Sequence, residues 1–172
     1  MRWLSERYGD PTKEWPAGPQ ELPAFDVWTM RLGTLSFGSA IESARFLGRP
    51  DLFRRRGRRA ELLYAGRGFQ IDFGPVGFCY LAFFIGEDAF VPDHPRLVFA
   101  RPKVTGCEEG DVVLSSDTGA GEIIRIFGEA DGEDTDDVEI ILTYRRRGTI
   151  LEFELNLDRR LKRWNLFPEA AS

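Results

Sequence analysis

Hydrophobic residues recur at every second position on both sides of a glycine, first around Gly68 and again around Gly148. The alternating residues are Leu62, Tyr64, Phe69, Ile71 and Phe73 in the first stretch and Leu142, Tyr144, Leu151 and Phe153 in the second. A period of two is typical of a half-buried β-strand, and a glycine between two such runs favours a tight turn. Each stretch therefore predicts a β-hairpin whose glycine has a positive φ.

A short helical pattern precedes each hairpin. In residues 39–51, "SAIESARFLGRPD", apolar residues recur at three- and four-residue spacing, and Ser39 with Glu42 matches a capping box. Gly48 then predicts a left-handed helix end. The counterpart in residues 119–131, "GAGEIIRIFGEAD", has the same spacing and stops at Gly128. We expect a helix before each hairpin and a further strand after it.

The two halves also match residue by residue. When residues 36–81 are laid over residues 116–161 at a constant offset of 80, twelve positions are identical, where about three are expected by chance. The sequence therefore predicts an α+β protein of two tandem repeats of about 80 residues, each a short helix followed by antiparallel strands, with the helices packed on one side of the sheet. The predicted divisions are an N-terminal arm (1–25), repeat 1 (26–90), a connector (91–105) and repeat 2 (106–172).

The arm and the connector lie outside the repeated pattern. The arm contains a helical stretch at residues 2–8, several prolines, and Trp3 and Trp15, which predict that it docks on the rest of the chain. The connector is too long for a tight turn, so it either adds a strand or forms a functional loop.

One motif carries a resemblance to a known family. The stretch "LGTLSFGSAIESARFLGRPD", residues 32–51, resembles the opening motif of the β-lactamase-inhibitor-protein-like fold, shared with the SmpA/OmlA family of small outer-membrane lipoproteins. The second copy has Ala130 where the motif has proline. The resemblance implies a BLIP-like tandem fold with a protein-binding surface on a sheet that spans both repeats.

Composition narrows the class of protein. With 172 residues, 42% hydrophobic and 13% aromatic, the chain can bury a sizeable core. No apolar run approaches the roughly 18 residues of a membrane span, and no leader is apparent, so we expect a soluble, cytoplasmic, bacterial protein. The net charge of −5 argues against nucleic acid as a partner. Cys79 and Cys107 lack zinc-site spacing, and we expect no metal or cofactor.

Three features of the sequence bear on catalytic or metal-binding chemistry. His94 follows Asp93 directly. It is either a general base that the carboxylate orients or an ordinary exposed histidine of a loop. Residues 129–137, "EADGEDTDD", lack the spacing of a calcium loop. Glu152 and Glu154 lie on one side of a strand, and we expect them to form a solvent-exposed face and not an acid/base pair. The sequence predicts no enzyme.

Charge differs between equivalent positions of the two halves. The first half has a basic segment and the second an acidic one; the basic residues are Arg54, Arg55, Arg56, Arg58 and Arg59, and the acidic ones include Asp134, Asp136 and Asp137. Three accounts are open: solvated loops that drifted apart, loops that pair within the molecule, and recognition of a partner with complementary charge.

The stretch "GFCYLAFFI", residues 77–85, would place apolar residues on both faces of a strand. Both of its faces must be covered. The helix of the repeat can cover one, and the other needs the arm, the connector, a second subunit or a partner protein. Phe78, Tyr80 and Phe84, on one side of this strand, are therefore candidate partner-binding residues beside the charged segments.

Two classes of function follow. The first is a non-catalytic protein-binding module, an inhibitor or immunity-type regulatory protein whose partner is an unidentified protein, with a homodimer left open. The alternative is a small-molecule-binding protein or enzyme with a pocket between the repeats, near His94 and Tyr64 or Tyr144. A polar pocket that contains His94 would favour the alternative.

Overall fold

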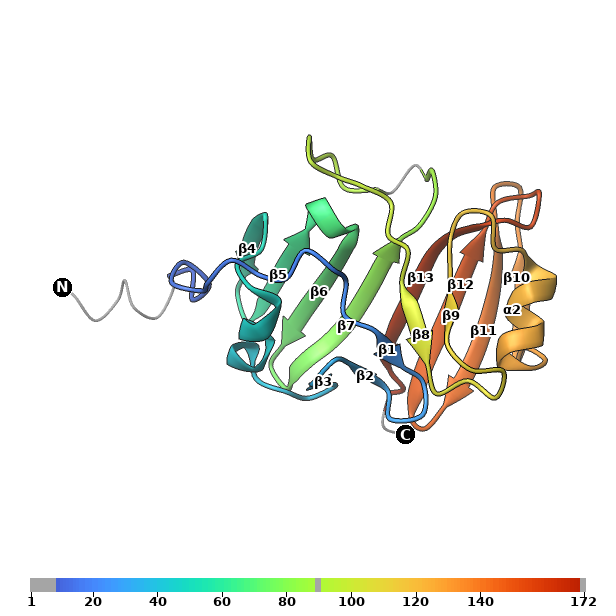
Figure 1. The fold of residues 1–172 in the computed structure, drawn as a ribbon, viewed down its shortest axis with the longest axis horizontal. Coiled ribbons are helices and arrows are strands. Elements are labelled where there is room, and N and C mark those ends of the chain that lie inside the picture. Colours follow the sequence, from blue (N-terminus) through green and yellow to red (C-terminus); the bar gives the residue numbers. More distant parts are fainter. Residues whose placement is uncertain (1–8, 89–90, 171–172) are drawn as a thin grey trace.

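The protein is built mainly of β-strands arranged in two sheets (Figure 1). The computed structural model describes residues 9–88 and 91–170. The larger sheet has eight strands in the order β10-β11-β12-β13-β7-β6-β5-β4, and every neighbouring pair is antiparallel. Its strands are β4 (Leu52–Arg56), β5 (Arg59–Tyr64), β6 (Phe69–Gly74), β7 (Gly77–Phe84), β10 (Gly132–Thr135), β11 (Ile140–Arg146), β12 (Thr149–Leu155) and β13 (Leu161–Pro168).

The smaller sheet has five short strands in the order β3-β2-β1-β8-β9. They are β1 (Phe25–Asp26), β2 (Arg31–Leu32), β3 (Leu35–Ser36), β8 (Lys103–Thr105) and β9 (Val112–Val113). Strands β1 and β8 pair in parallel, and the other pairs are antiparallel. Because β8 comes from residues 103–105, the predicted connector adds a strand, but to this smaller sheet and not to the sheet of the two repeats.

Helices form a minor part of the structure. They are η1 (Ile41–Leu47) and η2 (Ala65–Arg67), both 3₁₀ helices, and α2 (Ala120–Phe127). Of the residues that the structure describes, strands hold 40% and helices 11%. The predicted α+β class, with one helix per repeat packed on the sheet, is therefore wrong. The prediction failed because the strands of the smaller sheet have only two or three residues, too few to produce a periodic pattern.

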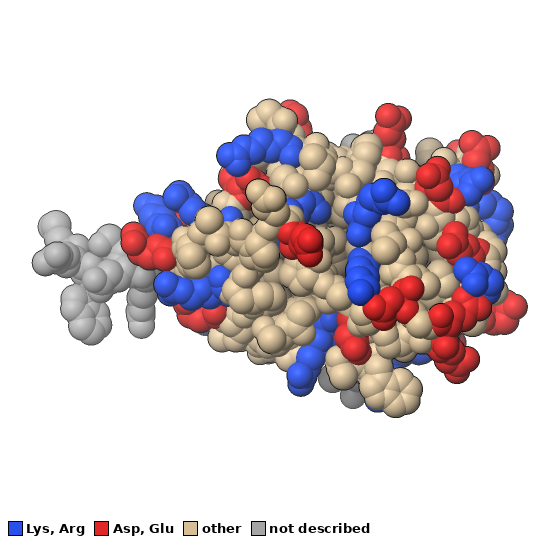
Figure 2. All heavy atoms as spheres, viewed as in Figure 1, with Lys and Arg blue, Asp and Glu red and all other residues tan. Residues whose placement is uncertain are grey.

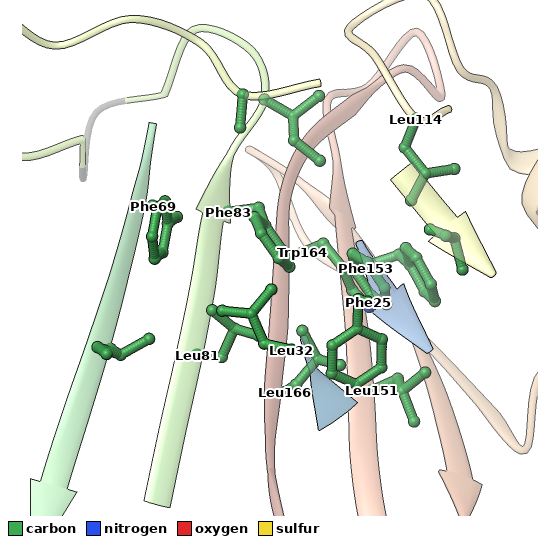
Figure 3. Close-up of a cluster of buried hydrophobic side chains, with 14 of the residues drawn as sticks. Phe25, Leu32, Phe69, Leu81, Phe83, Leu114, Leu151, Phe153, Trp164 and Leu166 are labelled. Atoms are coloured by element: carbon green, nitrogen blue, oxygen red, sulfur yellow. The ribbon is translucent and has the colours of Figure 1, made fainter. Parts of the chain in front are cut away.

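The main core lies between the two sheets, where Phe25 and Leu32 of the smaller sheet meet the larger one (Figure 3). Trp164 of β13 is fully buried at its centre. Its ring stacks on Phe153 of β12 and on Phe83 of β7, each with a centroid distance of 5.3 Å, and meets the edge of Phe25 at 5.3 Å. One side chain thus connects both halves of the large sheet and the small sheet.

Each half of the large sheet is a four-stranded meander that follows a helical segment, and the same contacts recur in both. The Tyr64 hydroxyl donates to the carbonyl of Gly48 at 3.1 Å, and the Tyr144 hydroxyl donates to the carbonyl of Gly128 at 3.0 Å. The two halves meet where β7 pairs with β13.

The offset between equivalent residues is not constant. The offset is 80 residues in the first part of each repeat, from the helical segment to Tyr64 and its counterpart Tyr144. In repeat 1 a four-residue turn separates Tyr64 from its partner Phe69, whereas in repeat 2 Tyr144 pairs with Leu151, two residues further along than the constant offset predicts. The faces are preserved because a shift of two residues keeps side chains on the same side of a strand. The turn glycines Gly68 and Gly148 both have positive φ, as predicted.

The predicted ends of the first helix are half right. Helix η1 starts after Ala40 without a side-chain cap, so the capping box of Ser39 and Glu42 does not form. The backbone N–H of Phe78 donates to the Ser39 carbonyl at 2.8 Å, and the Ser39 hydroxyl lies 3.2 Å from that of Ser36. Gly48 has the predicted positive φ of 74°, but its ψ of −176° is extended rather than left-handed helical.

A second, smaller apolar cluster lies on the opposite face of the large sheet. It contains Leu63, Ala65, Ala82 and Phe84, and Leu97 packs over it. The backbone N–H of Ala100 donates to the carbonyl of Phe84 at 2.6 Å, which holds the segment 97–100 in place. Both faces of β7 are therefore covered by the chain itself, one by the small sheet and one by this segment.

Candidate functional site: an arginine-lined groove

The N-terminal arm docks on the end of η1 through direct backbone contact. A Cβ atom placed on Gly18 would lie 2.0 Å from the carbonyl oxygen of Leu47, and one on Gly48 would lie 2.1 Å from the nitrogen of Gly18. The backbone N–H of Arg49 donates to the Pro16 carbonyl at 3.0 Å. Trp15 is buried, as the sequence predicted for this tryptophan. The predicted helix at 2–8 and Trp3 lie outside the described residues.

The connector approaches the same region from the other side. One guanidinium nitrogen of Arg96 lies 2.9 Å from a carboxylate oxygen of Asp51, which follows η1. The other oxygen of Asp51 accepts the backbone N–H of Gly66 at 3.0 Å. The Nδ1 atom of His94 accepts the backbone N–H of Arg96 at 3.2 Å. This bond places the proton of a neutral His94 on Nε2, and Nδ1 is not oriented by Asp93.

Arg67 connects the arm to the sheet. Its guanidinium donates to the Leu47 carbonyl at 2.6 Å and to the Pro19 carbonyl at 3.2 Å. It also lies 4.5 Å above the centre of the Tyr64 ring. Partial burial lowers the pKa of Arg67, and burial raises the pKa of Tyr64. Arg67 remains charged despite this shift because a guanidinium does not lose its proton in proteins.

These segments enclose an open groove of about 1080 Å³. Its walls are the arm, residues 49–51, the turn around Gly66, and residues 94–96. Three guanidinium groups, those of Arg49, Arg67 and Arg96, line it together with His94, whereas Asp51 is the only carboxylate among the lining residues within 9–88 and 91–170. Asp51 is already paired with Arg96, so the groove carries an excess of positive charge in a protein whose net charge is −5.

The groove can hold anionic groups. The side chain of Arg96 is 70% exposed, and Arg49 is exposed as well, so both can reach a ligand. A guanidinium matches a carboxylate or phosphate with two parallel hydrogen bonds. Trp15 and Tyr64 supply apolar floor and wall beside these charges.

The structure places the predicted site residues elsewhere. The basic segment is a hairpin rather than a loop: Arg54, Arg55 and Arg56 belong to β4, Arg58 to the turn and Arg59 to β5, all exposed. The acidic residues Asp134, Asp136 and Asp137 are exposed at the end of β10 and in the turn after it. Strands β4 and β10 are the two edges of an eight-stranded sheet, and seven spacings of about 4.8 Å put them roughly 34 Å apart, so these segments do not pair within the molecule.

The aromatic residues predicted to bind a partner are buried or partly buried in the protein interior. Phe78 is buried and stacks on Phe37 with a centroid distance of 4.6 Å, and Phe84 is buried in the smaller cluster. Tyr80 is partly buried, and its hydroxyl donates to the Asn165 side chain at 2.7 Å. Burial raises the pKa of Tyr80 to about 12. In this arrangement Phe78 and Phe84 are not available to a partner.

Sequence reasoning singled out His94 and Tyr64 for the alternative function, and both line the groove. It missed Arg49, Arg67 and Arg96. The only signal was the repeated "Arg-Gly" at positions 67 and 147. The counterpart of Arg67 in the structure is Arg146, which lies 5.3 Å above the Tyr144 ring and donates to the Phe127 carbonyl at 3.4 Å, whereas Arg147 lies 4.1 Å above the ring of Trp28. Tyr144, the other tyrosine named for the pocket, does not line this groove.

Other kinds of site are not supported by the described residues. Within 9–88 and 91–170, no three histidine, cysteine or acidic side chains come together as a metal site would require. Burial raises the pKa of both Cys79 and Cys107, which keeps these thiols protonated. In the same part of the chain, none of the helices combines the length and apolar character needed to cross a bilayer.

Comparisons with known proteins give little further guidance. No known family profile matches the chain, and no curated protein sequence matches it. Among solved structures, the chain is similar to a DUF4309 family protein, YjgB, from Bacillus subtilis. The two are 12% identical, with a TM-score of 0.48, and the alignment covers 80% of this chain and 83% of that one.

Proposed function

We propose that this protein is a non-catalytic binding module that takes an acidic segment of a partner protein into the groove formed by the arm, η1 and the connector. The observation that carries the proposal is the set of three guanidinium groups, with a single and already paired carboxylate, around one open cavity. Opposite charge in such a groove speeds encounter and selects the partner.

The shape of the groove favours an extended peptide. At about 1080 Å³ it exceeds the usual range of small-molecule pockets, roughly 300–1,000 Å³, and it is open to solvent. One wall is itself an extended peptide, residues 15–20, whose backbone carbonyls accept hydrogen bonds from the Arg49 N–H and the Arg67 guanidinium. A second extended segment can lie alongside it.

The proposal is tested with two fluorescent peptides of about 12 residues, one containing several glutamates and one with glutamine at the same positions. We expect the glutamate peptide alone to raise the fluorescence anisotropy on binding. Replacing Arg49 and Arg96 by alanine removes charge-assisted hydrogen bonds worth about 1.5–3 kcal/mol each, so the affinity should fall at least tenfold. Equal binding of the glutamine peptide overturns the proposal.

The basic edge of the sheet supplies a matched control. Arg54→Ala with Arg56→Ala removes two exposed arginines that lie outside the groove, with the same change of net charge. This variant should bind the glutamate peptide as the unchanged protein does. A similar loss of affinity in both double variants would mean that net charge, and not the groove, holds the peptide.

A small anionic ligand is a second candidate, favoured by the presence of His94 and Tyr64 in the same groove. A competition experiment distinguishes a small anionic ligand from an acidic peptide. If citrate or inorganic phosphate at millimolar concentration displaces the peptide, and Arg49→Ala with Arg96→Ala abolishes binding of that anion, the groove binds a small molecule. If neither anion competes, the peptide proposal stands.

A further inference from the structure

The large sheet ends in two edges of opposite charge. Strand β4 forms one edge and exposes Arg54 and Arg56, and strand β10 forms the other and exposes Asp134. Figure 2 shows acidic side chains gathered at the end of the molecule that carries α2 and β10. In the part of the chain that the structure describes, β4 pairs only with β5 and β10 only with β11. Each edge therefore presents backbone donors and acceptors to a further strand.

The strand directions allow these two edges to join. All neighbouring strands of the large sheet are antiparallel, and their number is even, so β4 and β10 run in opposite directions. If a second copy is placed beside the first by translation along the sheet, its β10 runs antiparallel to β4 of the first copy. The sheet then continues with the same alternation across the boundary. The two edges also have similar lengths, five residues in β4 and four in β10.

The side chains would meet on matching faces. Cross-strand partners point to the same side of a sheet. Arg54 stands opposite Glu61, which stands opposite Asp72 and then Tyr80, so Arg54 lies on the face of the smaller apolar cluster. Asp134 stands opposite Ile141 in a row that continues through Glu154 and Arg163 to Phe84, a residue of that cluster. Arginines and aspartate would therefore face each other on one side of the joined sheet.

Charge also selects against the two symmetric alternatives. A two-fold pairing of β4 with β4 brings arginines opposite arginines, and a pairing of β10 with β10 brings acidic residues opposite acidic residues, and both are unfavourable. From these observations we infer that copies of this chain associate head to tail, with β4 of one copy paired to β10 of the next. This contact uses different surfaces on each side, so it propagates into a ring or a linear array rather than closing as a dimer.

The test is a charge exchange measured by sedimentation velocity. One variant, Arg54→Glu with Arg56→Glu, makes both edges acidic, and the other, Asp134→Arg with Asp137→Arg, makes both edges basic. At about 20 mM salt and about 100 µM protein, we expect the weight-average mass of the unchanged protein to rise at least twofold above that of the single chain. The rise should disappear near 0.5 M salt, where charges are screened within a few ångströms.

Each variant alone should remain a single chain, and an equimolar mixture of the two should associate, because every boundary then joins an acidic edge to a basic one. Circular dichroism checks that both variants fold. The inference is overturned if the unchanged protein stays a single chain at low salt, if either variant associates as the unchanged protein does, or if the mixture fails to associate. Because neither variant alters the groove, binding of the acidic peptide reports separately on the proposed function.

Discussion

Gly48 and Gly128 hold the same backbone shape in different surroundings. Their φ values are 74° and 83°, and their ψ values of −176° and −171° are extended. This combination is accessible almost only to glycine. A Cβ atom on Gly48 would collide with the arm, whereas one on Gly128 would meet nothing within 4 Å. Comparing substitutions at Gly48 and Gly128 therefore separates the free-energy cost of backbone strain from the contribution of the docked arm.

We predict that Gly48→Ala destabilises the protein more than Gly128→Ala. Both variants should lose about 1–3 kcal/mol from the strained backbone. Gly48→Ala should also displace the arm and speed its cleavage by protease near residues 15–20. Chemical denaturation and limited proteolysis check this. Equal losses of stability with an equally protected arm would show that the contact between Gly18 and Gly48 contributes nothing to docking.

Asp72 is a carboxyl group that folding makes harder to ionise. Burial raises its pKa from 3.8 to about 6, and Glu61, opposite it on β5, contributes in the same direction. The folded state therefore keeps its proton where the unfolded state has lost it. Between about pH 4 and pH 6 the folded state binds more protons, and stability from this group falls as the pH rises.

Replacing Asp72 by asparagine should remove this pH dependence. We expect Asp72→Asn to gain stability relative to the unchanged protein as the pH rises from 4 to 7, by on the order of 1–2 kcal/mol. Denaturant midpoints at several pH values measure the difference. Glu61→Gln should lower the pKa of Asp72 and so reduce the same effect in part. A stability difference that is constant across this pH range would contradict the assignment.

At the scale of elements, the segment 97–100 acts as a strap over the smaller apolar cluster. It is held by hydrogen bonds to Ala65 and Phe84 and by close approach to Gly68. A Cβ atom on Gly68 would lie 2.4 Å from the Val98 carbonyl oxygen. On Gly148, in the equivalent turn, a Cβ atom would meet nothing within 4 Å.

Gly68→Ala should therefore loosen the strap, whereas Gly148→Ala should not. Both carry the cost of an alanine at positive φ, roughly 1 kcal/mol. Only Gly68→Ala should speed hydrogen exchange at Val98 and Ala100, whose amides donate to the carbonyls of Ala65 in η2 and Phe84 in β7, and expose the cluster around Phe84. Exchange followed by mass spectrometry gives the comparison. Unchanged protection of residues 97–100 in Gly68→Ala would show that the strap is held without this contact.

The elements that could be predicted from the sequence are those with enough residues to show a period. The hairpins around Gly68 and Gly148 and the helix ends at Gly48 and Gly128 formed where the pattern placed them. The small sheet escaped detection because its strands have only two or three residues and because its central pairing, β1 with β8, joins residues distant in sequence. The groove escaped for the same reason, since Arg49, Arg67 and Arg96 come together only after the arm and connector dock. The resemblance to the SmpA/OmlA family stays a prediction.

At the scale of the whole molecule, Trp164 makes the two halves one unit. Its ring contacts Phe83 of the first half, Phe153 of the second and Phe25 of the small sheet. A polar bridge adds to this on the other face, where Tyr80 of β7 donates to Asn165 of β13 and Asn165 donates to Glu154 of β12.

We predict that Trp164→Ala costs about 3–5 kcal/mol, as expected for a large aromatic side chain removed from a core. The unchanged protein should unfold in one cooperative transition, because the halves share this core. In Trp164→Ala the transition should broaden or split. Calorimetry measures both. A single sharp transition with a loss below about 1 kcal/mol would show that the halves are joined by the β7–β13 backbone pairing alone.

The position of β13 in the middle of the sheet also determines the order in which the protein can be assembled during synthesis. Strand β7 ends at Phe84, and its partner β13 begins only at Leu161. While a ribosome makes the residues between them, β7 has no strand beside it on the edge that β13 will occupy. Phe83 has no aromatic partner there until Trp164 has been synthesised. Contacts so distant in sequence form slowly, and an unpaired apolar strand invites aggregation. The nascent chain is therefore most vulnerable in the interval between these two strands, and a chaperone that binds extended apolar segments would find its target in residues 77–85.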